Sequence, residues 1–215
     1  MALSDRLTAP EYYDRDAEGF AARYDAVSFE AVHPLLSCYL PDRGRALDIG
    51  AGSGRDARAM AARRLWVTAV EPSEGLRAIG SAKNADIRWI DDRLPWLATL
   101  DGEAGTFDFI LCSAVLMLVA PTELDRSFIS MARLLAERGR LGLNLREPRP
   151  GEPADLFHDH DDGAVLAAAE AAGLRCIDRG VAKDAIGRAN YRWRSFVFAR
   201  AADGQPIVER SADAK

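Results

Sequence analysis

The stretch that decides the fold is Ala46-Leu47-Asp48-Ile49-Gly50-Ala51-Gly52-Ser53-Gly54-Arg55-Asp56. An apolar strand pattern runs into three glycines at alternate positions, and a helix pattern follows directly. Glycines at such a turn let the backbone approach a ligand closely, and the helix after them offers unpaired N–H groups. Glu71 ends the next strand pattern, where a doubly wound α/β fold places the acid that holds ribose hydroxyls. The sequence therefore predicts a site for a nucleoside-containing cofactor.

The residues around the glycines indicate which cofactor this is. A dinucleotide-binding loop has its third glycine three positions after the second, and here that position is Arg55. Asp48 stands at the strand end, where its negative charge would repel a pyrophosphate and attract a cation. S-adenosylmethionine carries an ammonium, a sulfonium, a ribose and an adenine. The charge of Asp48 therefore favours S-adenosylmethionine over a nicotinamide dinucleotide.

Five motifs in their usual order make the chain resemble the class I S-adenosylmethionine-dependent methyltransferases, of the bacterial type that acts on small molecules or on unassigned substrates. Together they cover roughly residues 46–145; the N-terminal segment and the C-terminal third carry no diagnostic motif. The motifs are LDIGAGSG (47–54), VTAVEPS (67–73), IDDRLP (90–95), FDFILCS (107–113) and RLLAERGRLGL (133–143).

The resemblance implies a role for individual residues. Asp48 would reach the cofactor's amino group through water, Glu71 would take both ribose hydroxyls, and Asp91 would accept from the adenine amino group. Asp92 would place its backbone near the adenine ring, and the Ser113 carbonyl would touch the methionine end. The other residues expected at the cofactor are Gly50, Ala51, Gly52 and Gly54 along the methionine part, Pro72 and Ser73 beside the adenine, and Arg55, which could equally be solvated or paired with Asp56.

Alternating strand and helix patterns predict a single doubly wound, Rossmann-like α/β domain. The resemblance adds that the sheet has seven mostly parallel strands with an antiparallel last strand, covered by helices on both faces. Strands are expected near 45–49, 66–70, 86–90, 107–112, 139–145, 174–178 and 192–200. Helices are expected near 56–64, 74–81, 122–137 and 164–172, the third with Thr122 close to a capping box.

The ends of the chain are expected to differ from this domain, which we place at residues 41–202. Residues 1–40 show helical patterns at 11–24 and 29–40, and in the resembling family such a segment covers the cofactor as a lid. Tyr13 and Tyr24 could then close over the cofactor, or could simply anchor the segment by packing. Residues 203–215 are polar and are expected to form a flexible tail.

Three histidines are the weak candidates for a catalytic base, and no catalytic residue can be assigned. His33 precedes Pro34 and is more simply a packed or capping residue. His158 and His160 lie in an acidic run, but alternating ligands seldom close a metal site, and Asp161 or Asp162 as a helix cap explains the acids. We expect no metal. Arg188 could meet an anionic substrate group, although the alternation around it predicts a strand.

Composition limits the partners. The 215 residues carry a net charge of −5, which argues against a nucleic-acid partner. No apolar run is long enough to span a membrane, the start of the chain has no signal-peptide pattern, and three widely spaced cysteines fit a reducing cytoplasm. We expect methyl transfer to a small-molecule acceptor. The alternatives are a non-catalytic S-adenosylmethionine-binding protein or partner subunit, a nicotinamide-dependent oxidoreductase and, less so, an aminopropyl transferase.

Overall fold

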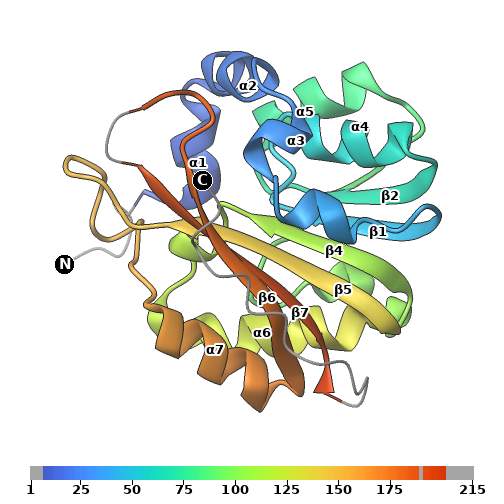
Figure 1. The fold of residues 1–215 in the computed structure, drawn as a ribbon. Helices are drawn as coiled ribbons and strands as arrows, with labels where there is room; N and C mark the ends of the chain where they lie inside the picture. The colour runs from blue at the N-terminus through green and yellow to red at the C-terminus, as the bar shows by residue number, and fades with distance from the viewer. Residues whose placement is uncertain (1–6, 189–190, 202–215) are drawn as a thin grey trace.

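A computed structural model describes residues 7–188 and 191–201 as an α/β sandwich around a seven-stranded sheet (Figure 1). The strand order is β3-β2-β1-β4-β5-β7-β6. Strands β1 to β5 run parallel, and β7 is antiparallel to both of its neighbours. The strands are β1 (Gly44–Ile49), β2 (Leu65–Val70), β3 (Arg88–Ile90), β4 (Phe107–Ser113), β5 (Leu135–Arg146), β6 (Leu174–Lys183) and β7 (Arg192–Arg200).

Helices cover both faces of this sheet (Figure 1). Side chains alternate across a strand, so Ala46 packs on one face of β1 while Leu47 and Ile49 pack on the other. The first face is covered by α4 (Arg55–Ala62) and by the segment with α3 (Phe29–Val32) and the 3-10 turn η1 (Leu36–Tyr39). The second is covered by α6 (Leu124–Leu134) and α7 (Asp162–Ala171). The sheet and its register confirm the predicted fold.

The N-terminal region is helical but more broken than the pattern predicts. The stretch 11–24 forms two helices, α1 (Ala9–Asp14) and α2 (Ala17–Asp25), because the Asp16 side chain accepts from the Gly19 amide and starts a new helix. Both pack against α5 (Glu74–Lys83). The second pattern, 29–40, ends as a helix at Val32, two residues before Pro34, which cannot continue it as an α-helix.

Several element boundaries differ from the sequence-based expectation. Strand β6, expected at 174–178, continues to Lys183, and β3, expected at 86–90, starts only at Arg88. Thr122 does not cap a helix: it lies in the 3-10 turn η4 (Pro121–Glu123), and α6 begins after it without a side-chain cap. Strand β5 starts at Leu135, four positions earlier than expected, and leaves α6 correspondingly shorter. The 3-10 turns η2 (Ala98–Glu103) and η3 (Leu116–Leu118) flank β4. No helix within the described residues is long and apolar enough to cross a membrane, and the predicted tail, 203–215, lies outside them.

Candidate active site at the carboxyl edge of the sheet

A cavity of about 470 Å³ opens at the carboxyl ends of the parallel strands. Its walls come from the glycine loop after β1, the end of β2, the loop after β4, the end of β5 and the N-terminal helices. Strands β1 and β4 are neighbours in the sheet while the chain runs outward from them in opposite directions. Open α/β sheets bind their ligands at such a switch point, so the cavity lies where the fold predicts a ligand.

The glycine loop has a backbone that other residues resist. Gly50, Gly52 and Gly54 have φ angles of +68°, +56° and +79°, in the left-handed region that favours glycine. A Cβ atom on Gly50 would lie 2.3 Å from Cγ2 of Val115, in the loop after β4. Gly50, Ala51 and Gly52 line the cavity; Gly54 does not, and instead begins α4.

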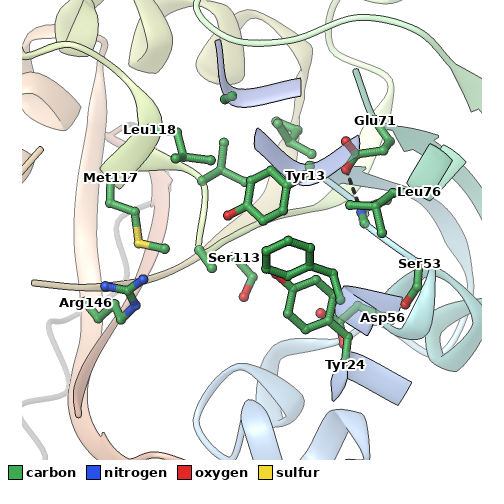
Figure 2. A pocket seen from close by; sticks show the side chains of 18 of the residues that line it. Tyr13, Tyr24, Ser53, Asp56, Glu71, Leu76, Ser113, Met117, Leu118 and Arg146 are labelled. Carbon is green, nitrogen blue, oxygen red and sulfur yellow. Dashed lines mark hydrogen bonds between the residues drawn. The ribbon is translucent and has the colours of Figure 1, made fainter. Parts of the chain in front are cut away.

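Glu71 ties this loop to the end of β2. Its two carboxylate oxygens accept from the amides of Gly52, at 2.7 Å, and of Ser73, at 2.8 Å; the dashed line in Figure 2 marks the first of these bonds. Burial raises the pKa of Glu71 to about 7, against the lowering effect of these two bonds. Each oxygen keeps a lone pair beyond the amide it already accepts from, so the carboxylate can also accept from two ligand hydroxyls.

A second acid lies beneath the loop without a counter-charge of its own. Asp48 is buried, and its Oδ2 has no hydrogen-bond partner among the described residues. Burial, and then repulsion from Asp56, raise the pKa of Asp48 well above its usual range. Asp48 does not line the cavity, whereas Asp56 does. A cationic group bound nearby would stabilise the charged form of this buried carboxyl.

Asp56 is held from two sides. The Arg55 guanidinium donates to both of its oxygens at 2.7 Å, so Arg55 is paired with its neighbour, and its Nη1 also contacts the Tyr24 carbonyl at 3.4 Å. His33 Nε2 lies 3.0 Å from Asp56 Oδ2. His33 is fully buried, with Nδ1 3.5 Å from the Asn144 amide and its ring packed on Phe29. His33 therefore packs behind the site and does not line it.

The predicted adenine side of the site is only partly assembled. Pro72 and Asp92 line the cavity, together with Leu76. The Asp92 carboxylate accepts from the amides of Arg93 and Thr99. The Asp91 side chain is exposed, contacts Arg77 Nη2 at 3.2 Å and does not line the cavity. Ser73 is buried at the start of α5, where its hydroxyl accepts from the Leu76 amide.

Two tyrosines from the N-terminal helices face the glycine loop. Tyr13 of α1 and Tyr24 of α2 both line the cavity, and Figure 2 shows both side chains near Ser113. Burial raises the pKa of Tyr13 well above its usual range and that of Tyr24 to about 12. Both hydroxyls are therefore neutral at physiological pH and can donate hydrogen bonds, but they are poor general bases.

The two remaining histidines, His158 and His160, do not line the cavity. His160 is buried, and its Nε2 donates to the carbonyls of Leu116 and Val119 at 2.9 and 3.0 Å. His158 is partly buried and does not line the cavity. Asp161 caps α7 through the Ala164 amide, as predicted. Residues 7–188 and 191–201 contain no group of three or more His, Cys, Asp or Glu arranged for a metal ion.

The far end of the cavity consists of residues that sequence reasoning missed, apart from Arg188. Arg146 at the end of β5, Arg149, Glu152 and Asp184 all line it. Figure 2 shows Arg146 on the opposite side of the cavity from Glu71, with Tyr13 between them. The position of Arg146 at the end of a parallel strand was a usable signal, because ligands bind at that edge. Arg149, Glu152 and Asp184 lie in two loops that are far apart in the sequence, so only the folded chain brings them together.

Comparison with known proteins shows which domain family the sheet and its loops match. Residues 46–139 match a family model described as a methyltransferase domain. The chain carries a class I S-adenosylmethionine-dependent methyltransferase domain. No curated protein sequence matches the chain.

Solved structures with this fold include three methyltransferases that are distant in sequence. A TehB-like S-adenosylmethionine-dependent methyltransferase from Corynebacterium glutamicum has a TM-score of 0.67 and 19% identity, over 89% of this chain and 97% of that one. The 1,6-didemethyltoxoflavin-N1-methyltransferase of Burkholderia thailandensis scores 0.63 with 18% identity, over 92% and 93%. Phosphoethanolamine N-methyltransferase 2 of Haemonchus contortus scores 0.68 with 17% identity, over 91% and 60%.

The methyltransferase domain supplies only part of the cavity wall. The glycine loop, Glu71, Asp92 and Ser113 lie within the matched residues. Tyr13 and Tyr24 precede that region, and Arg146 and Arg188 follow it. The cofactor of the family is S-adenosylmethionine.

Proposed function

We propose that this protein transfers the sulfonium methyl group of S-adenosylmethionine to a small-molecule acceptor by in-line displacement. The observation that carries the proposal is the extent of the cavity, which continues past Glu71 and the glycine loop to Arg146 and Trp193. A cavity that extends this far beyond the glycine loop can hold an acceptor beside the cofactor. The Burkholderia and Haemonchus enzymes are described with small molecules, 1,6-didemethyltoxoflavin and phosphomonomethylethanolamine, and with S-adenosylhomocysteine.

The cofactor half of the proposal rests on two buried acids. Glu71 would accept from the ribose hydroxyls while keeping its bonds to Gly52 and Ser73, and the Asp48 carboxylate, whose Oδ2 has no partner among the described residues, would offset the ammonium through water. Gly50, Ala51 and Gly52 would lie along the methionine part, and the Ser113 carbonyl would lie near its end. Asp92 and Pro72 would border the adenine; Asp91 would join them only by leaving Arg77.

Alignment and exclusion of water would do most of the catalytic work. A methyl group on a sulfonium already has a good leaving group, so the protein has to hold donor and acceptor in line. We assign no general base. Tyr13 and Tyr24 would close the site and donate hydrogen bonds, because their raised pKa values keep them protonated.

The N-terminal segment, residues 1–40, is the proposed lid over a domain that runs from residue 41 to about 202. We also infer a reducing, cytoplasmic setting from three free thiols, Cys38, Cys112 and Cys176. The net charge of −5 supports a small acceptor over nucleic acid.

Methyl-labelled S-adenosylmethionine tests the reaction and the size of the acceptor together. The protein is incubated with a cell extract that has been divided by ultrafiltration into small molecules and macromolecules. We expect label in the small-molecule fraction, at a rate that Glu71→Ala lowers strongly. Label confined to the macromolecules would contradict the small-molecule acceptor, and no transfer in either fraction, with cofactor bound, would favour the non-catalytic alternative.

A further inference from the structure

Three arginines converge on one aromatic ring at the far end of the cavity. The guanidinium carbons of Arg146, Arg149 and Arg188 lie 5.3, 4.9 and 4.1 Å from the centroid of Tyr191. All three arginines line the cavity. Cations within about 6 Å of a ring are attracted to it, but three like charges around one ring also repel each other. An anion between them would relieve this repulsion.

The carboxylates nearby do not balance these charges. Glu152 serves two of the arginines: its Oε1 accepts from Nη2 of both Arg146 and Arg149, each at 2.6 Å. Arg188 is paired with Asp184, through Nε at 3.0 Å and Nη2 at 2.6 Å. Two acids thus face three arginines, and the adjacent Lys183 lines the same cavity.

The lining of the whole cavity also has more positively than negatively charged side chains. Among the described residues, seven arginine and lysine side chains line it against five aspartate and glutamate side chains, although the chain as a whole has a net charge of −5. A positive cavity in an acidic protein selects for negatively charged ligands, since the rest of the surface repels them.

Donor groups remain for such a ligand. The hydrogen bonds of Arg149 and Arg188 to the two acids use Nε and Nη2, and within the described part of the chain nothing accepts from Nη1 of either. The Tyr191 hydroxyl is buried and likewise has no partner among those residues. A guanidinium with a free N–H edge suits a carboxylate or phosphate oxygen.

The wall between this cluster and the cofactor half is apolar. Met117, Leu118, Phe157 and Tyr13 line it, and Phe157 also packs on the Arg146 guanidinium at 5.7 Å. A ligand that reaches the arginines from the glycine loop therefore passes apolar and aromatic side chains, which favour an apolar body.

We infer that the methyl acceptor is an amphipathic anion: an apolar body that carries one acidic group, a carboxylate or a phosphate, held by Arg149, Arg188 and Lys183 at the end of the cavity opposite Glu71. The inference rests on the proposed function, because the acidic group is placed relative to the cofactor half. Arg146 positions this cluster through its buried pair with Glu152.

Three probes with the same phenyl ring test the charge requirement: benzoate, phenyl phosphate and neutral benzamide. Each is titrated by ligand-observed NMR into the protein with and without S-adenosylhomocysteine. We expect at least one of the two anions to bind about tenfold or more tightly than benzamide, as charge-assisted bonds imply. The two anions compared with each other show whether the group is a carboxylate or a phosphate.

Arginine variants locate the binding. Arg149→Gln with Arg188→Gln should abolish the preference for the anion and leave the affinity for S-adenosylhomocysteine unchanged. Arg126→Gln is the matched control, because Arg126 also stacks on an aromatic ring, Trp96 at 4.9 Å, but does not line the cavity.

Equal responses from anions and benzamide, including no response from any probe, would overturn the inference, as would a preference that survives the double variant. If S-adenosylhomocysteine itself fails to bind, the proposed function fails separately. The titrations without cofactor still report on the cluster in that case.

Discussion

At the scale of single residues, Glu71 should make cofactor binding depend on pH. Its pKa is raised to about 7 by burial, and ribose hydroxyls donate to the ionised form. Binding should therefore lower this pKa and release a proton, so that affinity for S-adenosylhomocysteine rises by up to about tenfold from pH 6 to pH 8. Asp48, also raised in pKa, acts in the same direction. Calorimetry in buffers of different ionisation enthalpy measures the proton count.

The raised pKa of Glu71 has the opposite effect on the stability of the protein without cofactor: stability falls, and does not rise, as the pH increases. The folded chain holds the Glu71 proton more tightly than the unfolded chain, so this group favours folding at low pH and loses that contribution as pH rises through about 7. Glu71→Gln should flatten both pH profiles. A wild-type affinity that is independent of pH between 6 and 8 would show that Glu71 does not change its protonation on binding.

Gly50 should tolerate no side chain because a Cβ atom would clash with Val115, and the effect of this clash can be separated from that of backbone strain. Gly105 has nearly the same φ, +67° against +68°, but a Cβ there meets nothing within 4 Å, whereas on Gly50 it meets Val115 at 2.3 Å. Gly50→Ala should therefore lower the free energy of unfolding by about 1–3 kcal/mol more than Gly105→Ala. Denaturant unfolding measures both, and adding Val115→Ala should recover part of the difference. Equal losses would rule out the clash.

At the scale of elements, the lid proposal depends on two aspartates, Asp14 at the C-terminal end of α1 and Asp25 at the C-terminal end of α2. Asp14 accepts from the Ser73 hydroxyl at 2.5 Å and the Gly75 amide at 2.9 Å, at the start of α5. Asp25 accepts from the Ser53 hydroxyl at 2.8 Å and Arg58 at 2.9 Å, beside the glycine loop. Both contacts join the N-terminal helices to loops that also hold the cofactor half of the cavity.

Asp14→Ala should therefore loosen the lid without unfolding the sheet. We expect faster hydrogen exchange in α1 and α2, unchanged exchange in β1 and β4, and severalfold weaker binding of S-adenosylhomocysteine, as loss of charge-assisted bonds implies. Glu18→Ala, on α2 and without such contacts among the described residues, is the control. Unchanged exchange in α1 and α2 would contradict a lid held by Asp14.

Strands, helices and turns could be predicted where the sequence pattern that determines them spans only a few residues. The strand at 192–200 and the glycine turn follow from the sequence alone, because alternation and glycine spacing act over a few residues. The helical pattern at 11–24 does not reveal the break that the Asp16 cap makes between α1 and α2. The cap at Thr122 was wrong because Thr122 lies in the 3-10 turn that begins at Pro121. Competition between neighbouring caps is not visible in apolar periodicity.

At the scale of the whole molecule, the position of the glycine loop, Glu71 and Ser113 at one end of the cavity could be predicted, and the arginine cluster at the other end could not. Gly50, Glu71 and Ser113 lie in motifs whose order fixes their place at one edge of the sheet. The cluster of Arg146, Arg149 and Arg188 depends on β5 and β7 pairing as neighbours although α7 and β6 separate them in the chain. No spacing rule brings those arginines to one ring.

The measurement that tests the central claim most directly is titration calorimetry with S-adenosylhomocysteine, with a nicotinamide dinucleotide as the competing ligand. Wild type, Glu71→Ala and Glu170→Ala, which alters an exposed acid on α7, are compared at pH 8. We predict saturable binding of S-adenosylhomocysteine alone, weakened at least about tenfold by Glu71→Ala and unchanged by Glu170→Ala. Binding of the dinucleotide, or S-adenosylhomocysteine binding that is unaffected by Glu71→Ala, would contradict the account.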